Sequence, residues 1–157
     1  MATPGESTSS TLRIQMNCPR VLLADDREEM LRTVAQLLKD EFDLVGAVEN
    51  GKRVLELVDS LSPDILVLDI CMPTMSGIEA ALRLKEAGSL TRVVFLTVHA
   101  DLDFVEAALS AGALGYVLKP LLATHLIPAI RKALEGKVFV SQASYACVDW
   151  CSCGRTV

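Results

Sequence analysis

The stretch Ile65-Leu66-Val67-Leu68-Asp69 constrains the fold of this chain more than any other. Four consecutive apolar residues, preceded by Ser62-Pro63 and followed by Pro73, are typical of a short strand buried on both faces. Such strands belong to parallel sheets that are covered by helices on both sides. Asp69 would then stand at the carboxyl end of its strand, at the edge where open α/β sheets bind ligands.

Short apolar runs and amphipathic stretches alternate along the rest of the chain. Further strands are predicted at residues 21–24, 44–48, 93–96 and 116–118. Apolar residues at helical spacing follow each strand, and the last helix is predicted around residues 126–134 with Pro128 near its first turn. Five strand–helix units predict an α/β fold, a doubly wound (βα)5 parallel five-stranded sheet of the flavodoxin-like type.

Composition limits the class of function. Half of the 157 residues are hydrophobic, which is enough for one well-packed domain. The net charge of −5 argues against DNA binding, which needs a basic face. No apolar run approaches the ~20 residues of a membrane span, and the N-terminus does not resemble a secretory signal. Five scattered cysteines, an odd number, indicate reduced thiols and a cytoplasmic protein.

The ends of the chain are predicted to lie outside the folded domain. Residues 1–19 are rich in Ser and Thr without periodicity and are predicted to form a disordered extension. Residues 20–137 make up the domain, and residues 138–157 are predicted to be a linker remnant with a disordered tail. That tail contains Cys147, Cys151 and Cys153, which lack a complete set of metal ligands.

Polar residues follow the predicted strands and should therefore meet at one edge of the sheet. They are Asp25, Asp26, Asp69, Thr97 and Lys119. Two like charges ~4 Å apart cost about 4 kcal/mol at an effective dielectric near 20, so converging carboxylates favour a cation such as Mg²⁺. Taken singly, each residue has a simpler interpretation: the aspartates as caps, the threonine as a turn residue and the lysine as a solvated charge. Together they supply a nucleophile, metal ligands, a cation and a hydroxyl, which are the functional groups that phosphoryl transfer needs.

In combination and order, these residues resemble the receiver domains of two-component response regulators. The matching motifs are the acidic pair Asp25-Asp26, Leu68-Asp69-Ile70-Cys71-Met72-Pro73, Leu96-Thr97, and Gly115-Tyr116-Val117-Leu118-Lys119-Pro120. The resemblance spans residue 20 to about residue 137. It implies that a sensor histidine kinase transfers a phosphoryl group to Asp69, in a phosphorelay that switches the conformation of the domain. The chain would catalyse only its own phosphorylation and dephosphorylation, and would not be an enzyme in the wider sense.

The resemblance also implies a set of metal ligands. Asp26 and Asp69 would bind Mg²⁺ directly together with the backbone carbonyl of Cys71. Asp25 would contribute to the same site through a water molecule.

Three further residues are implied to switch the domain. Thr97 and Lys119 would bind phosphoryl oxygens, and Tyr116 would move together with Thr97. The Lys119-Pro120 bond is expected to be cis. His99 and Cys71 occupy positions that tune dephosphorylation in the family, although an exposed loop histidine is the simpler interpretation of His99.

The last helix and the residues after it resemble a particular group of regulators. Residues 129–141 are similar to the end of receivers that carry a LuxR-type helix-turn-helix output domain. Only sixteen residues follow Ser141, too few for a DNA-binding domain, so no direct DNA binding by this chain is expected. The chain is therefore predicted to be the receiver part of a LuxR-type transcriptional regulator without its DNA-binding domain.

Two alternatives remain beside this prediction. A stand-alone receiver would signal through protein contacts, and a homodimer is a possible assembly. A Mg²⁺-dependent phosphatase with an aspartyl-phosphate intermediate is less favoured, because such sites usually need a second acid near the nucleophile and none closely follows Asp69.

Overall fold

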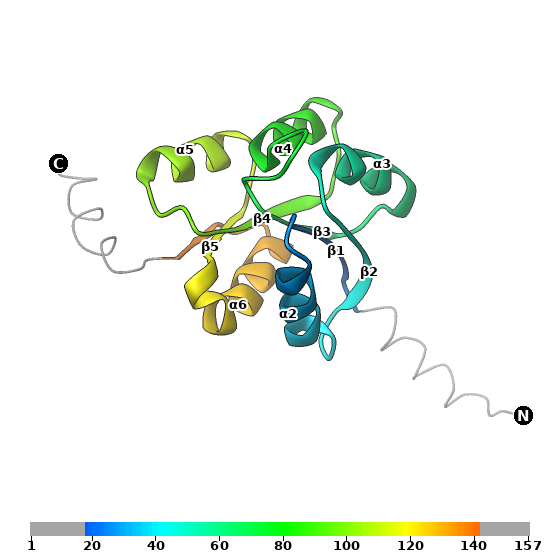
Figure 1. Ribbon diagram of the computed structural model, residues 1–157, viewed down its shortest axis with the longest axis vertical. Coiled ribbons are helices and arrows are strands. Elements are labelled where there is room, and N and C mark those ends of the chain that lie inside the picture. The colour runs from blue at the N-terminus through cyan, green and yellow to red at the C-terminus, as the bar shows by residue number, and fades with distance from the viewer. Residues whose placement is uncertain (1–17, 142–157) are drawn as a thin grey trace, which may run out of the picture.

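The computed structural model describes residues 18–141, in which strands and helices alternate (Figure 1). The strands are β1 (Arg20–Ala24), β2 (Asp43–Val48), β3 (Ile65–Leu68), β4 (Arg92–Thr97), β5 (Gly115–Leu118) and β6 (Phe139–Val140). The helices are α2 (Glu28–Leu38), α3 (Gly51–Leu61), α4 (Gly77–Glu86), α5 (Leu102–Ser110), the 3₁₀ turn η1 (Lys119–Leu121) and α6 (Leu122–Leu134). Within residues 18–141 no helix is long and apolar enough to cross a membrane.

All strands join one parallel sheet in the order β2-β1-β3-β4-β5-β6. Every residue of β3 is buried, as its uninterrupted apolar sequence predicts. The chain runs outward from β1 to β2 and then crosses back to β3, so the winding reverses between β1 and β3. That reversal is where sheets of this type form a ligand-binding crevice, and the predicted doubly wound fold is confirmed.

Helices cover both faces of the sheet (Figure 1). Helices α3, α4 and α5 lie on one face, and α2 and α6 lie on the other. Successive strand residues alternate between these two layers because side chains point to opposite faces of a strand. In β1, Leu22 packs in the core under α3, whereas Leu23 packs in the core under α2.

The sixth strand corrects the predicted five-stranded sheet. Phe139 and Val140 pair in parallel with Gly115 and Tyr116 at the outer edge of β5. A strand of two residues is too short to show an alternating pattern. Its pairing depends on the chain returning to the sheet after α6, which no local pattern records.

The segment after β5 corrects two further predictions. Lys119–Leu121 forms η1 and leads directly into α6, so Pro128 lies inside the helix rather than near its first turn. The Lys119–Pro120 bond is trans, not cis. Proline suits the first turn of a helix, because its φ is already helical and it has no N–H to satisfy there. Most of the predicted disordered extension (residues 1–19) and most of the predicted linker and tail (residues 138–157) lie outside the described residues, which begin at residue 18 and end at residue 141.

Candidate functional site

Asp69 lies at the carboxyl end of β3 and is held there by backbone contacts. Its N–H donates to the carbonyl oxygen of Ala24, 3.0 Å away. The N–H of Gly77 donates to the carbonyl of Ile70 at 2.7 Å, which brings the start of α4 close behind the strand end. A Cβ atom on Gly77 would stand 2.0 Å from the carbonyl oxygen of Asp69, so only glycine permits this approach. Asp69 therefore has a fixed backbone and is only 6% exposed.

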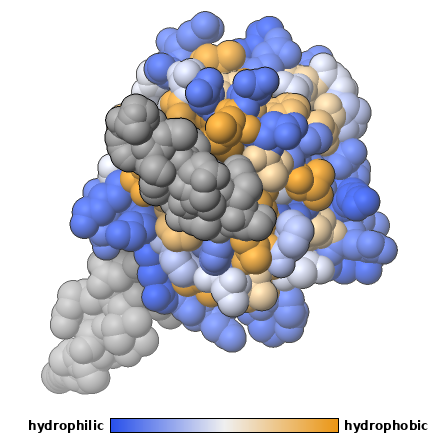
Figure 2. Space-filling view, turned by 90° about the vertical axis from the view of Figure 1, so that its left-hand side faces the viewer, coloured by the Kyte–Doolittle hydropathy of each residue, from blue (hydrophilic) through white to orange (hydrophobic). Residues whose placement is uncertain are grey.

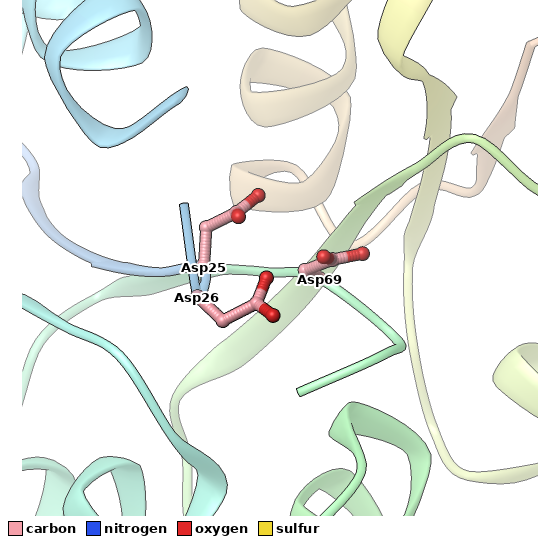
Figure 3. A group of neighbouring side chains, drawn as sticks. All are labelled: Asp25, Asp26 and Asp69. Atoms are coloured by element: carbon pink, nitrogen blue, oxygen red, sulfur yellow. The ribbon is translucent and has the colours of Figure 1, made fainter. Parts of the chain in front are cut away.

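Three aspartates meet at the reversal between β1 and β3 (Figure 3). Asp25 and Asp26 follow β1, Asp69 follows β3, and the closest carboxylate oxygens of the three lie within 4.8 Å of one another. Asp25 is buried, and its Oδ1 accepts the backbone N–H of Arg27 at 2.8 Å. Asp26 is exposed, so the cluster opens to solvent on its side. The structure thus brings together the three carboxylates that the sequence places at strand ends.

Lys119 compensates part of this negative charge. Its Nζ lies 2.8 Å from Oδ2 of Asp25 and 3.2 Å from Oδ2 of Asp69, and its side chain is 9% exposed. Three carboxylates against one ammonium group leave two negative charges uncompensated. Hard oxygen ligands that are partly open to solvent and carry this excess charge fit a divalent cation such as Mg²⁺.

Burial and the neighbouring charges shift the protonation of both partners. Burial raises the pKa of Asp69; Lys119 opposes this shift and Asp25 adds to it, with a net upward result. Burial alone would lower the pKa of Lys119. The hydrogen bond to Asp25 and the charges of both aspartates outweigh it, so the pKa of Lys119 is raised. Lys119 therefore stays charged, while Asp69 holds a proton more readily than an exposed aspartate does.

Thr97 and Tyr116 contact the same residue of the loop between β4 and α5. Thr97 ends β4, is fully buried, and its Oγ1 accepts the N–H of His99 at 3.3 Å. The hydroxyl of Tyr116, which is 1% exposed, donates to the carbonyl oxygen of His99 at 2.6 Å. The two residues predicted to switch together are thus linked through the backbone of one loop residue.

His99 also contacts Cys71, which the sequence did not predict. Its Nε2 lies 3.1 Å from the Sγ of Cys71, and its ring stacks on Phe104 with centroids 4.3 Å apart. His99 as a whole residue is only partly exposed, which corrects its interpretation as an exposed loop residue. A signal was available, because Cys71 and His99 each lie two residues beyond the polar end of a strand, and those two strands are neighbours.

Comparison with known proteins gives one consistent match. The family model described as "Response regulator receiver domain" matches residues 21–131. The nitrate/nitrite response regulator protein NarL of Escherichia coli K12 is 37% identical over 128 residues, which cover 80% of this chain and 59% of NarL. The chemotaxis protein CheY of Halobacterium salinarum is 33% identical over 115 residues, which cover 73% of this chain and 96% of CheY.

A solved structure supports the same match. The crystal structure of a LuxR-family two-component response regulator from Aurantimonas sp. SI85-9A1 superposes with a TM-score of 0.74 at 27% identity. The match covers 78% of this chain and 89% of that one. Against the NarL protein, by contrast, this chain spans about three fifths of the relative's length.

Proposed function

This chain belongs to the family of response regulator receiver domains, and we propose that Asp69 is its phosphoacceptor residue. One observation carries the proposal: a fixed, buried Asp69 shares its site with Asp25, Asp26 and Lys119. The proposed donor is the phosphohistidine of a sensor histidine kinase. A carboxylate oxygen of Asp69 forms the new P–O bond, the P–N bond of the donor breaks, and the leaving imidazole nitrogen keeps the electron pair.

The proposed metal is Mg²⁺, held directly by Asp26, Asp69 and the backbone carbonyl of Cys71, with Asp25 acting through water. When bound, the ion neutralises charge on the transferring phosphoryl group. The residues themselves support this assignment, since Asp26 opens to solvent while Asp25 is already occupied by Lys119 and Arg27. Direct binding of the ion by Asp25 would disturb its contacts with Lys119 and Arg27, so a contribution through water is favoured.

The proposed switch uses Lys119, Thr97 and Tyr116. Lys119 already reaches Oδ2 of Asp69 and can follow a phosphoryl oxygen placed there. Thr97 offers its hydroxyl from the neighbouring strand end. If Thr97 turns toward that oxygen, its contact with the N–H of His99 is lost, and the loop that also holds the Tyr116 hydroxyl must rearrange. The loop between β4 and α5 is therefore the proposed output element.

The proposed biological role is the receiver part of a LuxR-type transcriptional regulator in the cytoplasm, catalysing only its own phosphorylation and dephosphorylation. The match to longer transcriptional regulators supports this role. The almost complete coverage of the haloarchaeal CheY protein favours the alternative, a stand-alone receiver that signals by protein contact. Figure 2 shows hydrophobic surface among hydrophilic residues on the side of the molecule that carries α5. Val98, in the loop before α5, and Leu102, the first residue of α5, are 62% and 43% exposed. A partner protein or a second copy of the chain could use that surface.

The proposal is tested by incubating the protein with acetyl phosphate and following its intact mass. Wild-type protein should gain one phosphoryl group in the presence of Mg²⁺ and none in EDTA. Asp69→Asn should gain none, whereas Asp59→Asn, which changes an exposed aspartate on α3, should behave like the wild type. Uptake by Asp69→Asn at the wild-type rate would refute the assignment. Sustained turnover of a phosphomonoester would instead indicate the phosphatase alternative.

A further inference from the structure

Ser141 is the last residue that the structure describes, and it is buried, with 1% of its surface exposed. Its backbone N–H donates to the carbonyl oxygen of Tyr116 at 2.7 Å. Its Oγ accepts the backbone N–H of Leu118 at 3.1 Å. One residue therefore holds β5 at two points, on either side of Val117.

The short length of β6 explains this arrangement. The ladder between β5 and β6 pairs Gly115 with Phe139 and Tyr116 with Val140, and then it ends. Leu118 lies beyond the ladder but is still buried, so its N–H needs an acceptor that a longer strand would have supplied. The hydroxyl of Ser141 provides that acceptor from the side chain.

His125 of α6 completes the contact. Its Nδ1 lies 2.9 Å from the Oγ of Ser141, and Phe139 meets the His125 ring edge-on with centroids 5.6 Å apart. A hydroxyl can accept from Leu118 and still share one further hydrogen bond with the imidazole. Strand β5, helix α6 and the segment after β6 thus meet at a single oxygen atom.

The residues that Ser141 holds adjoin two residues of the proposed phosphorylation site. Leu118 directly precedes Lys119, whose Nζ bridges Asp25 and Asp69. Tyr116 accepts the N–H of Ser141 at its backbone carbonyl. Its side-chain hydroxyl donates to the carbonyl of His99, in the loop after β4. The β5 backbone from which the side chains of Tyr116 and Lys119 extend is therefore tied to Ser141.

We propose that Ser141 is a positioning residue for phosphoryl transfer. By holding Leu118, its hydroxyl sets Lys119 against Asp69, and His125 orients that hydroxyl. Because coupling between two sites is reciprocal, phosphorylation of Asp69 changes how firmly the segment at Ser141 is held to β5. The transfer step rests on the function proposed above, whereas the positioning of Lys119 does not.

The first measurement uses the unphosphorylated full chain and the ¹⁵N resonance of the Lys119 ammonium group. Ser141→Ala should shift this resonance and speed hydrogen exchange at the Leu118 amide. Ser60→Ala, which removes an exposed hydroxyl bonded within α3, is the matched control and should change neither. An unshifted Lys119 resonance in Ser141→Ala would overturn the proposal.

The second measurement is the rate of phosphoryl uptake from acetyl phosphate, with Mg²⁺ affinity determined separately. Losing one net hydrogen bond predicts uptake slower by about 3- to 10-fold in Ser141→Ala. Mg²⁺ affinity should be unchanged, because Asp25, Asp26 and Asp69 remain. A parallel loss of Mg²⁺ affinity would mean general damage to the site and would overturn the positioning role. If the wild type takes up no phosphate, the proposed function fails, and the Lys119 resonance still decides the positioning.

A second pair of variants covers the case in which Ser141→Ala does not fold. His125→Asn keeps a polar group near the position of Nδ1, and His125→Leu removes it at similar volume. The Lys119 resonance should stay close to the wild type in His125→Asn and shift in His125→Leu. Identical spectra for the two variants would contradict the part assigned to His125.

Discussion

Asp69 is a buried carboxylate whose neighbours act on its charge in opposite directions. Burial and Asp25 favour the protonated form, Lys119 favours the ionised form, and the net effect raises the pKa of Asp69 above 3.8. The folded protein therefore binds this proton more tightly than the unfolded chain does. The cost to stability is absent below pH 3.8 and develops as the pH rises through the folded-state pKa.

Because ionised Asp69 lowers the stability of the fold, we predict that Asp69→Asn is more stable than the wild type at neutral pH in EDTA. An amide has no charge to desolvate, and Lys119 keeps its ion pair with Asp25. The gain in melting temperature should shrink as the pH falls toward 3.8. Thermal unfolding from pH 3 to pH 7 measures it, with Asp59→Asn as the control that should show no such trend. A lower melting temperature for Asp69→Asn at pH 7 would contradict the prediction.

Lys119 allows a second prediction at the same scale. Lys119→Met removes the ammonium group from two buried carboxylates, and breaking a buried ion pair costs about 3–5 kcal/mol. Urea unfolding in EDTA should show this loss, and saturating Mg²⁺ should restore part of it by supplying positive charge to the same oxygens. Lys52→Met, which alters an exposed lysine on α3, is the control. Equal losses with and without Mg²⁺ would argue against a shared cation site.

At the scale of elements, the position of Asp69 depends on how closely α4 approaches the end of β3. Helix α4 begins at Gly77, and Ser76 caps it through a hydrogen bond from the N–H of Glu79 at 3.1 Å. The cap defines where the helix begins, and the missing side chain of Gly77 lets that start press against the backbone of Asp69. The same close contact therefore stabilises the fold and orients the site.

Two glycine substitutions separate a steric clash from backbone strain. Gly77→Ala would place Cβ 2.0 Å from the carbonyl oxygen of Asp69, and we expect a loss of about 3 kcal/mol with slower phosphoryl uptake. Gly88→Ala meets nothing within 4 Å but has φ +74°, so it should cost about 1–2 kcal/mol without affecting uptake. Urea unfolding and intact mass measure both effects. Similar uptake in the two variants would show that the approach of α4 does not orient Asp69.

At the scale of the whole molecule, a parallel sheet gathers the carboxyl ends of all its strands at one edge. Residues separated by up to 94 positions in sequence, from Asp25 to Lys119, come within 2.8 Å of each other for this reason. Strand β6 completes the sheet on the outer side of β5, the strand that leads into Lys119, and Ser141 holds β5 just beyond β6. The boundary of the cooperative unit should therefore lie after Ser141 and not before β6.

Two truncations test that boundary. A chain that ends after Ser141 should keep the melting temperature and phosphoryl uptake of the full chain. A chain that ends after Lys137 loses β6 and leaves buried backbone groups of β5 without partners, at about 1–3 kcal/mol for each group. Calorimetry and intact mass compare the two. A large loss of stability in the longer truncation would place the boundary further along the chain.

The sequence alone determined the fold class and the residues gathered at the edge of the sheet. Both follow from local patterns, because strands and helices have distinct periods and parallel strands end on one side. Asp25, Asp26, Asp69, Thr97 and Lys119 could be identified in this way, as could the resemblance that the family match confirms. No knowledge of packing was needed for any of them.

Only the tertiary structure decided the sixth strand, the trans bond before Pro120, and the contacts of Ser141. A two-residue strand has no period, and a side chain that accepts one buried N–H leaves no repeating mark in the sequence. Such contacts form because the already packed elements place an unsatisfied group beside a suitable partner. They depend on distances between remote segments, which the periodicity of each segment does not encode.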